Sequence, residues 1–233
     1  MNGEKKIVQG DTAELEVARQ EMVARQIRDR GVGDERVLNA MRTVPRHLFV
    51  PVDHISRAYS DEPLPIGEEQ TISQPFMVAA MAEALSLQGR ERVLEIGGGS
   101  GYQAAVLSHL ALAVIAIEAR PALAVAAAKR IAHLGYSNVT VEVGDGSAGW
   151  PVSAPYEAIL VTAAAPSVPQ PLLDQLAEGG RLVIPVGQDE HQELLRLVKQ
   201  EGRITRQSLY ACRFVPLIGR YGQNQNTREA RRG

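Results

Sequence analysis

A strand-like run that turns into a glycine-rich loop is the first feature of this sequence that could do chemistry. Residues 93–105 read VLEIGGGSGYQAA. Glycines let a backbone turn tightly and approach a ligand closely. The helix that opens directly after them favours negative charge at its N-terminus. The stretch therefore indicates a ligand-binding loop at the end of a strand.

The spacing of this loop fits two classes of ligand. Residues 99–104 match the dinucleotide pattern G-x-G-x-x-G/A, and Glu118 follows Gly97 by 21 residues, where an acid that binds a ribose belongs. The second interpretation includes Glu95, which ends the strand ahead of the glycines. A carboxylate there would repel a pyrophosphate. It suits a cationic ligand such as S-adenosylmethionine, which carries an ammonium and a sulfonium charge.

A third acid favours the cationic ligand. Asp145 lies between two glycines at the end of the next strand-like run, where we expect it to accept a hydrogen bond from an adenine amino group. Asp-Gly also favours turns by itself, so an ordinary turn residue is the alternative. Acids at three successive strand ends predict S-adenosylmethionine as cofactor, held by Glu95, Gly97, Gly99, Gly101, Glu118, Asp145 and Gly146.

A serine in the stretch QTISQPF (70–76) is the second candidate. Ser73 has no histidine, lysine or cysteine within fifteen residues to activate it. Two other serines, Ser100 and Ser147, each miss the hydrolase pattern G-x-S-x-G by one glycine. Taken alone, Ser73 is best explained as an N-cap for a helix that starts near Pro75.

An alternation of strands and helices must position these residues. Strand-like runs cover 92–96, 113–118, 138–143, 157–163 and 181–186, and helix-like runs cover 102–111, 121–135 and 169–178. Several of the strands are continuously apolar, as expected when helices cover both faces of a sheet. The pattern predicts an α/β fold with a doubly wound, mostly parallel, Rossmann-like sheet. The runs at 193–199 and 204–218 predict a terminal hairpin.

A helical region precedes the sheet. We expect one helix over 13–30 that stops at Gly31, a second after the N-cap Asp34, and a third over 76–87. Residues 51–75 are expected to form an irregular but ordered segment. The predicted organisation is a single domain: N-terminal helices and an active-site segment at 13–75, packed on a cofactor-binding core at 76–220. We expect residues 1–12 to be frayed and 222–233 to be disordered.

Composition excludes several classes of protein. The 233 residues carry a formal net charge of −2, which argues against a dedicated nucleic-acid binder. One cysteine, Cys212, permits neither an internal disulfide nor a cysteine-based zinc cluster, and the five histidines show no metal-ligand spacing. No secretory signal or membrane span is evident. We therefore expect a cytoplasmic monomer that binds no metal, nucleic acid or membrane.

Several stretches of the chain carry signals beyond the glycine loop alone. They are RGVGDERVLNAMRTVPRHLFVP (30–51), AYSDEPLPIGEEQTISQPFMVAAM (58–81), VLEIGGGSGYQAAVLSHL (93–110), VGDG (143–146), PYEAILVTAAAPSVPQPLLDQLAEGGRLVIPVG (155–187) and RFVPLIG (213–219). In these stretches the chain resembles the protein-L-isoaspartate O-methyltransferase family, in its bacterial or archaeal form. The glycine motif is shared by many methyltransferases, but the other matches are far more specific. Gly98 departs from the family, which usually carries Thr or Ser there, and the tail after Tyr221 lies outside the shared pattern.

The resemblance implies methyl transfer from S-adenosylmethionine to the α-carboxylate of L-isoaspartyl residues in damaged proteins and peptides. The resulting ester recloses to a succinimide, which reopens in part to normal aspartate. This acceptor is already ionised at neutral pH, so no base is needed. The resemblance implies that Ser73 is the catalytic residue, which orients the acceptor carboxylate. Candidate substrate-binding residues are Ile66, Ile72, Ser73 and Val215, and core packing is the alternative for the three aliphatic ones.

Three other functions compete with this one. A methyltransferase for a small-molecule acceptor would share the cofactor site and differ in the segments at 58–81 and 213–219. An NAD-dependent oxidoreductase fits only the glycine loop and Glu118. A binding module without turnover is the third, and the intact acids and Ser73 argue against it.

Overall fold

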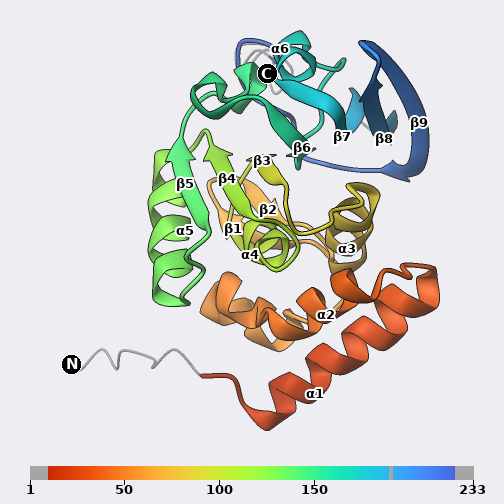
Figure 1. The fold of residues 1–233 in the computed structure, drawn as a ribbon. Coiled ribbons are helices and arrows are strands. Elements are labelled where there is room, and N and C mark those ends of the chain that lie inside the picture. Colours follow the sequence, from red (N-terminus) through yellow and green to blue (C-terminus); the bar gives the residue numbers. More distant parts are fainter. Residues whose placement is uncertain (1–9, 189–190, 224–233) are drawn as a thin grey trace.

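The structure, a computed structural model, describes residues 10–188 and 191–223. Its main feature is a seven-stranded sheet in the order β5-β4-β3-β6-β7-β8-β9 (Figure 1). The first five of these strands are parallel, β8 pairs antiparallel with β7, and β9 pairs antiparallel with β8. The predicted doubly wound sheet with a terminal hairpin is confirmed.

The apolar runs of the sequence form the strands of this sheet. The bounds of β3 and β4 are those expected from the sequence. The strands β7 and β8 are longer than expected, and β9 ends earlier than expected. The strands are β3 (Arg92–Ile96), β4 (Ala113–Glu118), β5 (Val139–Val143), β6 (Tyr156–Val161), β7 (Leu176–Gln188), β8 (His191–Gln200) and β9 (Arg203–Cys212).

Helices cover both faces of the sheet. The helices α3 (Pro75–Ala84), α4 (Tyr102–Ser108) and α5 (Pro121–His133) contribute to a core cluster on one face, and α6 (Gln170–Asp174) packs on the other. The helix expected over 169–178 is shorter than predicted, because Leu176 already pairs with Tyr156 in the sheet. The crevice between β3 and β6 is the point where the strand order reverses, and ligands of such sheets bind there.

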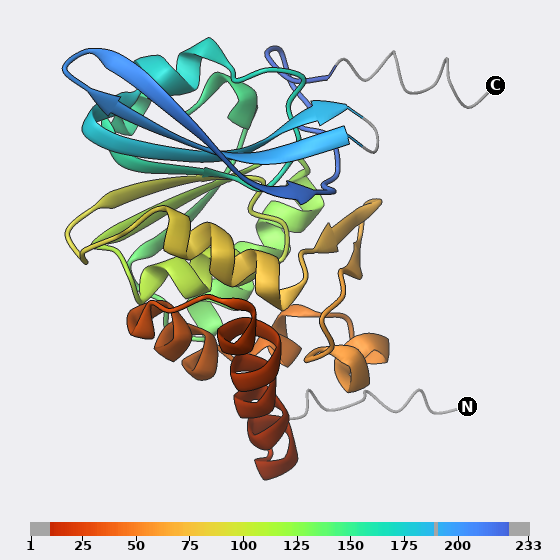
Figure 2. The ribbon, with the colours of Figure 1, turned by 90° about the vertical axis from the view of Figure 1, so that its right-hand side faces the viewer.

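The N-terminal helical region packs on the outer side of α3, away from the sheet (Figure 2). It consists of α1 (Ala13–Glu21), a π-helical turn (Met22–Ile27), a 3-10 turn (Arg28–Arg30) and α2 (Glu35–Thr43). Gly31 ends the first helical run with a φ of 101°, and the Asp34 carboxylate caps α2 through the N–H of Arg36, at 2.8 Å. Both predicted boundaries are confirmed. This region shares one apolar core with the sheet.

The segment at 51–75 is more regular than expected. It holds a 3-10 turn at Val52–Arg57, which follows another at Arg46–Phe49, and then a hairpin of β1 (Leu64–Gly67) and β2 (Gln70–Ile72). The expectation of an irregular segment is therefore corrected for these residues. Pro63 and Pro65 hid the strand pattern, since proline disfavours a strand assignment.

The chain just before α1 is held in place by side chains. Thr12 caps the helix, and the Asp11 carboxylate pairs with the Arg19 guanidinium at 2.8 Å. The expectation of a frayed start does not hold for these two residues. The earlier residues, and most of the tail expected to be disordered, lie outside the described part of the chain. Among the described residues, no helix has the length and apolar character needed to cross a membrane.

Candidate active site

The glycine loop follows β3 and lies directly against β6. The N–H groups of Gly97 and Gly98 both donate to the carbonyl of Ile117, at 2.9 and 3.2 Å. The Thr162 hydroxyl donates to the Gly97 carbonyl at 2.7 Å. Gly97 has a φ of 92°, and a β-carbon added to it would collide with that hydroxyl. Only glycine fits at this position, because the loop crosses the crevice so closely.

The other glycines of the loop have different environments. A cavity lies beside the loop, and Gly97, Gly98 and Gly99 all line it. Gly99 has a φ of 52°. Gly101 does not line this cavity: a β-carbon there would lie 3.3 Å from the Ile131 side chain, so this glycine lets α4 pack closely on α5. Its predicted part in cofactor binding stays a prediction. At Gly98 a β-carbon would find ordinary contact distances, so the loop tolerates this departure from the family pattern.

Glu118 holds the loop in shape. One of its carboxylate oxygens accepts from the Gly99 N–H at 2.8 Å, and the other accepts from the Arg120 N–H at 2.9 Å. The side chain is buried and lines the cavity. Each oxygen keeps a lone pair after these bonds, which leaves acceptors for the hydroxyl groups of a ligand.

Glu95 is fully buried at the base of the same cavity. Within the described chain, neither oxygen of its carboxyl group has a hydrogen-bond partner. Burial, with a smaller contribution from the nearby charge of Glu118, raises the pKa of Glu95 well above its usual value. A buried carboxyl group without partners is costly, so the site favours a ligand that brings a cationic donor to it.

Gln103 is a candidate that the sequence analysis missed. It belongs to the first turn of α4, is buried, and lines the same cavity. Its amide nitrogen Nε2 is buried without a partner among the described residues. An unpaired donor beside an unpaired carboxyl group matches a ligand with both acceptor and donor groups, such as an amino acid. The available signal was a lone amide in an otherwise apolar helix.

Asp145 has a different environment from the other two acids. It is exposed and does not line the cavity. Its carboxylate accepts from the Ser147 hydroxyl at 2.6 Å and from the Arg220 N–H at 2.8 Å, so it ties a short 3-10 turn to the C-terminal segment. This favours the turn interpretation for Asp145, and contact with an adenine stays a prediction. Gly146 does line the cavity, packed against Ile96.

Ser73 lies between β2 and α3. Among the described residues its hydroxyl has no hydrogen-bond partner, and the N-cap of α3 is Gln74, which makes no side-chain cap. The Asp61 carboxylate instead accepts from the Phe76 N–H at 3.2 Å in the first turn. The N-cap interpretation of Ser73 is therefore wrong, and its hydroxyl is available to a ligand.

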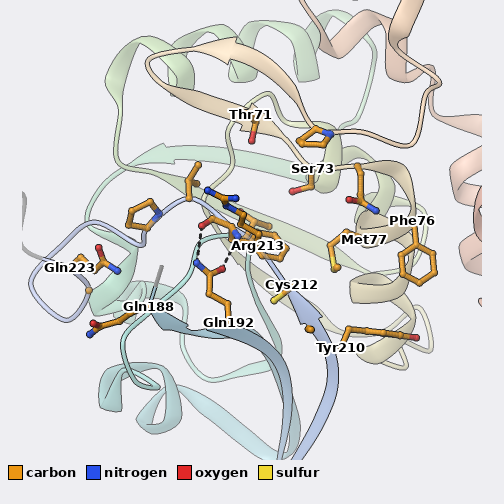
Figure 3. A pocket seen from close by; sticks show the side chains of 18 of the residues that line it. Thr71, Ser73, Phe76, Met77, Gln188, Gln192, Tyr210, Cys212, Arg213 and Gln223 are labelled. Atoms are coloured by element: carbon orange, nitrogen blue, oxygen red, sulfur yellow. Dashed lines mark hydrogen bonds between the residues drawn. The ribbon is translucent and has the colours of Figure 1, made fainter. Parts of the chain in front are cut away.

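A second, larger cavity adjoins the one beside the glycine loop. This groove has a volume of about 1220 Å³ and runs between the start of α3 and the chain that leaves β9 (Figure 3). The two cavities share one wall. Five residues line both: Thr71, Ser73, Thr162, Val215 and Pro216. The serine hydroxyl is thus placed where the two cavities meet.

The three aliphatic candidates for substrate binding have different positions. Val215 lines both cavities. Ile72 is buried and lines only the cavity beside the glycine loop, and Ile66 lines neither. The Ile66 side chain lies over the loop instead, 3.3 Å from where a β-carbon of Gly99 would be. The part of Ile66 and Ile72 in substrate binding stays a prediction.

The fold and the site define the class of protein. The strand order, the glycine loop at the switch point and the buried acids facing a cavity are those of a Rossmann-like S-adenosylmethionine-dependent methyltransferase. A dinucleotide fits less well, because the unpaired carboxyl group of Glu95 lies at the base of the cavity.

The particular family follows from comparison with known proteins. Residues 17–222 match the family model described as protein-L-isoaspartate(D-aspartate) O-methyltransferase (PCMT). Two similar curated proteins are protein-L-isoaspartate O-methyltransferase of Methanoculleus marisnigri, 57% identical over 88% of this chain and 93% of the relative, and protein-L-isoaspartate O-methyltransferase 2 of Geotalea uraniireducens, 55% identical over 89% and 96%. The chain belongs to this family of S-adenosylmethionine-dependent enzymes.

Solved structures agree with this assignment. A protein-L-isoaspartate O-methyltransferase superposes with a TM-score of 0.80 and 32% identity, over 92% of this chain and 69% of that one. A putative member from Plasmodium falciparum, in complex with S-adenosyl-L-homocysteine, superposes with a TM-score of 0.73 and 26% identity, over 86% and 98%. The recognition made from the sequence motifs is confirmed.

Proposed function

We propose that the acceptor carboxylate of an L-isoaspartyl residue binds in the groove and meets the methyl donor at Ser73. The observation that carries this proposal is the shared wall of the two cavities. Methyl transfer requires the two substrates to meet in line at about 3 Å. The five residues that line both cavities mark a place where a ligand in one cavity can approach a ligand in the other.

The chemistry of the groove suits an acceptor that is already an anion. Among the described residues that line it, none is a histidine, lysine, aspartate or glutamate. An isoaspartyl carboxylate, with a pKa near 4 in model compounds, needs no base at neutral pH. Ser73 donates one hydrogen bond to this carboxylate and orients the other oxygen toward the methyl group. Two arginines line the groove, Arg213 and Arg30, the second in an ion pair with Asp61, and no carboxylate residue does so among the described residues.

The residues of the smaller cavity fit the amino-acid end and the ribose of S-adenosylmethionine. Glu95 and Gln103, both with buried unpaired atoms, suit the ammonium and carboxylate groups of its amino-acid end. Glu118 retains acceptors for the ribose hydroxyls, and Gly97 and Gly99 leave room for close approach. When bound, S-adenosylmethionine supplies an electrophilic methyl group, and the acceptor oxygen takes that methyl group as the bond to sulfur breaks.

The size of the groove favours a polypeptide acceptor over a small molecule. Typical small-molecule pockets occupy about 300–1,000 Å³. The groove exceeds this range, at about 1220 Å³, and is open to solvent along exposed residues such as Tyr210 and Arg213. We propose damaged proteins and peptides as the substrates, whose methyl esters then reclose to succinimide without further catalysis.

Other parts of the proposal rest on the sequence. We propose that the enzyme acts as a cytoplasmic monomer, without nucleic acid or membrane. We also propose that residues 13–75 and 76–220 form a single domain, which the continuous core between the N-terminal helices and the sheet supports. Size-exclusion chromatography with light scattering measures the first property, and a single unfolding transition in calorimetry measures the second.

The experiment that tests the function is transfer of labelled methyl from S-adenosylmethionine to two matched peptides. One carries L-isoaspartate and the other L-aspartate at the same position. We expect label on the isoaspartyl peptide alone, released as methanol in base because the product is an ester. Label on neither peptide, with cofactor binding intact, would favour a small-molecule acceptor instead.

A further inference from the structure

The groove continues beyond Ser73 along an apolar surface. Figure 3 shows Met77, Phe76 and Cys212 beyond the serine and Tyr210 further away, on the side opposite to Gln188 and Gln223. We call these four residues the apolar arm. The proposed function uses only the part of the groove next to Ser73, so it assigns no ligand to the arm.

Two elements build the apolar arm. Helix α3 begins two residues after Ser73, which brings Phe76 and Met77 of its first turn to the groove. Strand β9 supplies the other side. A bulge at the Leu194/Leu195 step of its pairing with β8 is followed by a regular register, so Tyr210 and Cys212, two residues apart, face the same way.

The contacts within the arm keep it apolar and accessible. The rings of Phe76 and Tyr210 meet edge to face, with centroids 5.7 Å apart. Burial, followed by the nearby charge of Glu193, raises the pKa of Cys212 to about 11, so its thiol stays neutral. Tyr210 is 39% exposed, whereas Phe76 is only 5% exposed. The tyrosine ring therefore offers apolar area that a ligand can cover.

A cation borders this surface. The Arg30 guanidinium lies over the Phe76 ring, 3.7 Å from its centroid, and also pairs with Asp61. Arg30 lines the groove, and no acidic side chain does so among the described residues. An aromatic or aliphatic group finds complementary area beside the arm, whereas an ammonium group finds no carboxylate among the described residues that line the groove.

We propose that the apolar arm is a subsite for an aromatic or aliphatic side chain of the substrate, one or two residues away from the isoaspartate. The inference rests on the proposed function, because the acceptor carboxylate at Ser73 fixes where the peptide starts. An extended chain advances about 3.3–3.6 Å per residue, so only near neighbours of the isoaspartate reach the arm. The enzyme then prefers damage sites in apolar sequence contexts, which are exposed when a substrate protein is partly unfolded.

The test compares isoaspartyl peptides that differ at one flanking position. Phenylalanine, serine or lysine is placed in turn at the two positions before and the two after the isoaspartate, and kcat/KM is measured by transfer of labelled methyl. We expect phenylalanine to exceed serine by about tenfold at one or more of these positions, mainly through KM, and this ratio corresponds to about 1.4 kcal/mol. Lysine is expected to be the poorest.

Two variants of strand β9 test whether Tyr210 causes the preference for phenylalanine over serine. Tyr210→Ala is expected to bring the phenylalanine-to-serine ratio to within about twofold of one, since most of the exposed apolar area is lost. Ile204→Ala is the matched control: Ile204 lies on the same strand, is 38% exposed and does not line the groove. This control is expected to keep the wild-type ratio.

The possible outcomes separate the two proposals. Equal rates on all flanking residues, or a preference that survives Tyr210→Ala, would overturn the subsite and leave the methyltransferase assignment intact. Absence of transfer to every isoaspartyl peptide would instead contradict the acceptor assignment, and the subsite with it.

Discussion

The hydroxyl of Thr162 donates a hydrogen bond to the carbonyl of Gly97 across the crevice between β6 and β3, at 2.7 Å. The same hydroxyl lies 3.0 Å from the Ile96 carbonyl. This contact ties the glycine loop to the neighbouring strand at the switch point of the sheet. Thr162 also lines both cavities, so the side chain that anchors the loop lies at the same wall as Ser73.

Replacing this hydroxyl with a methyl group tests the contact. Thr162→Val leaves the Gly97 carbonyl without its side-chain donor, which costs about 1–3 kcal/mol for a buried group. We expect the melting temperature to fall by roughly 2–4 °C per kcal/mol in a protein of this size. Thr162→Ser is expected to stay close to wild type. A Val variant as stable as the Ser variant would contradict the anchoring role.

Two adjacent glycines give a matched pair for the loop. Gly97→Ala places a β-carbon against Thr162 and forces a positive φ on alanine, so we expect cofactor affinity to fall by more than about tenfold, or 1.4 kcal/mol. Gly98→Ala meets only ordinary contacts, the nearest being Ala116 at 3.4 Å, and is expected to bind the cofactor almost as wild type does. Isothermal titration calorimetry measures both. Equal losses in the two variants would argue against the steric explanation.

The raised pKa of Glu95 predicts how stability depends on pH. Because its pKa is raised, the folded cofactor-free protein keeps a proton on this carboxyl group to higher pH than the unfolded chain does, which releases it near the usual value of 4.5. The stabilising contribution is complete below that value and is lost as pH rises through the higher folded pKa. We expect Glu95→Gln to raise the free energy of unfolding of the free enzyme at pH 8 more than at pH 5, and chemical denaturation at the two pH values measures the difference.

The raised pKa of Glu95 also predicts that cofactor binding releases a proton. A cationic ligand group stabilises the ionised carboxylate of Glu95, so binding releases a proton wherever the free enzyme is protonated, and affinity rises with pH through that range. Calorimetry in two buffers of different ionisation enthalpy counts the protons. Glu95→Gln should bind the cofactor weakly and release none. Equal heats in both buffers for the wild type would show that Glu95 is already ionised.

The Ser73→Ala variant separates a role of the hydroxyl in orienting the acceptor carboxylate from a role in the stability of the fold. A hydrogen bond to a charged acceptor contributes about 1.5–3 kcal/mol, so turnover on an isoaspartyl peptide should fall by roughly ten- to a hundredfold. Stability should not change, because the hydroxyl has no partner among the described residues and Asp61 binds the first turn of α3 instead. Full activity in the Ala variant would exclude the proposed role.

The capping role of Asp61 is tested by its own variant. Asp61→Ala removes the acceptor for the Phe76 N–H and the ion pair with Arg30. We expect it to lose about 0.5–2 kcal/mol of stability, as for other lost caps. A stability loss in Ser73→Ala rather than in Asp61→Ala would restore the interpretation of Ser73 as the cap.

Local patterns in the sequence determined most of the elements. The apolar runs of β3 and β4, the stop at Gly31 and the cap at Asp34 were all predictable, because strand and helix periodicity and capping depend on residues close in the chain. The β1–β2 hairpin was not. Its strands are only four and three residues long, too short to show a period, and its tip holds Glu68 and Glu69 at positive φ, which non-glycine residues seldom adopt.

The sequence by itself determined the class of protein, the cofactor and the candidate acids, since these follow from motifs of adjacent residues. Only the tertiary structure decided which of them face a cavity. Gly101 packs on α5, Asp145 ties down a distant segment, and Gln103 lines the cavity beside the glycine loop with its amide nitrogen unpaired among the described residues. The junction itself joins Ser73 to Val215, which are far apart in the chain. A side chain's partners across such distances depend on how the sheet and its loops pack, and no local pattern encodes that.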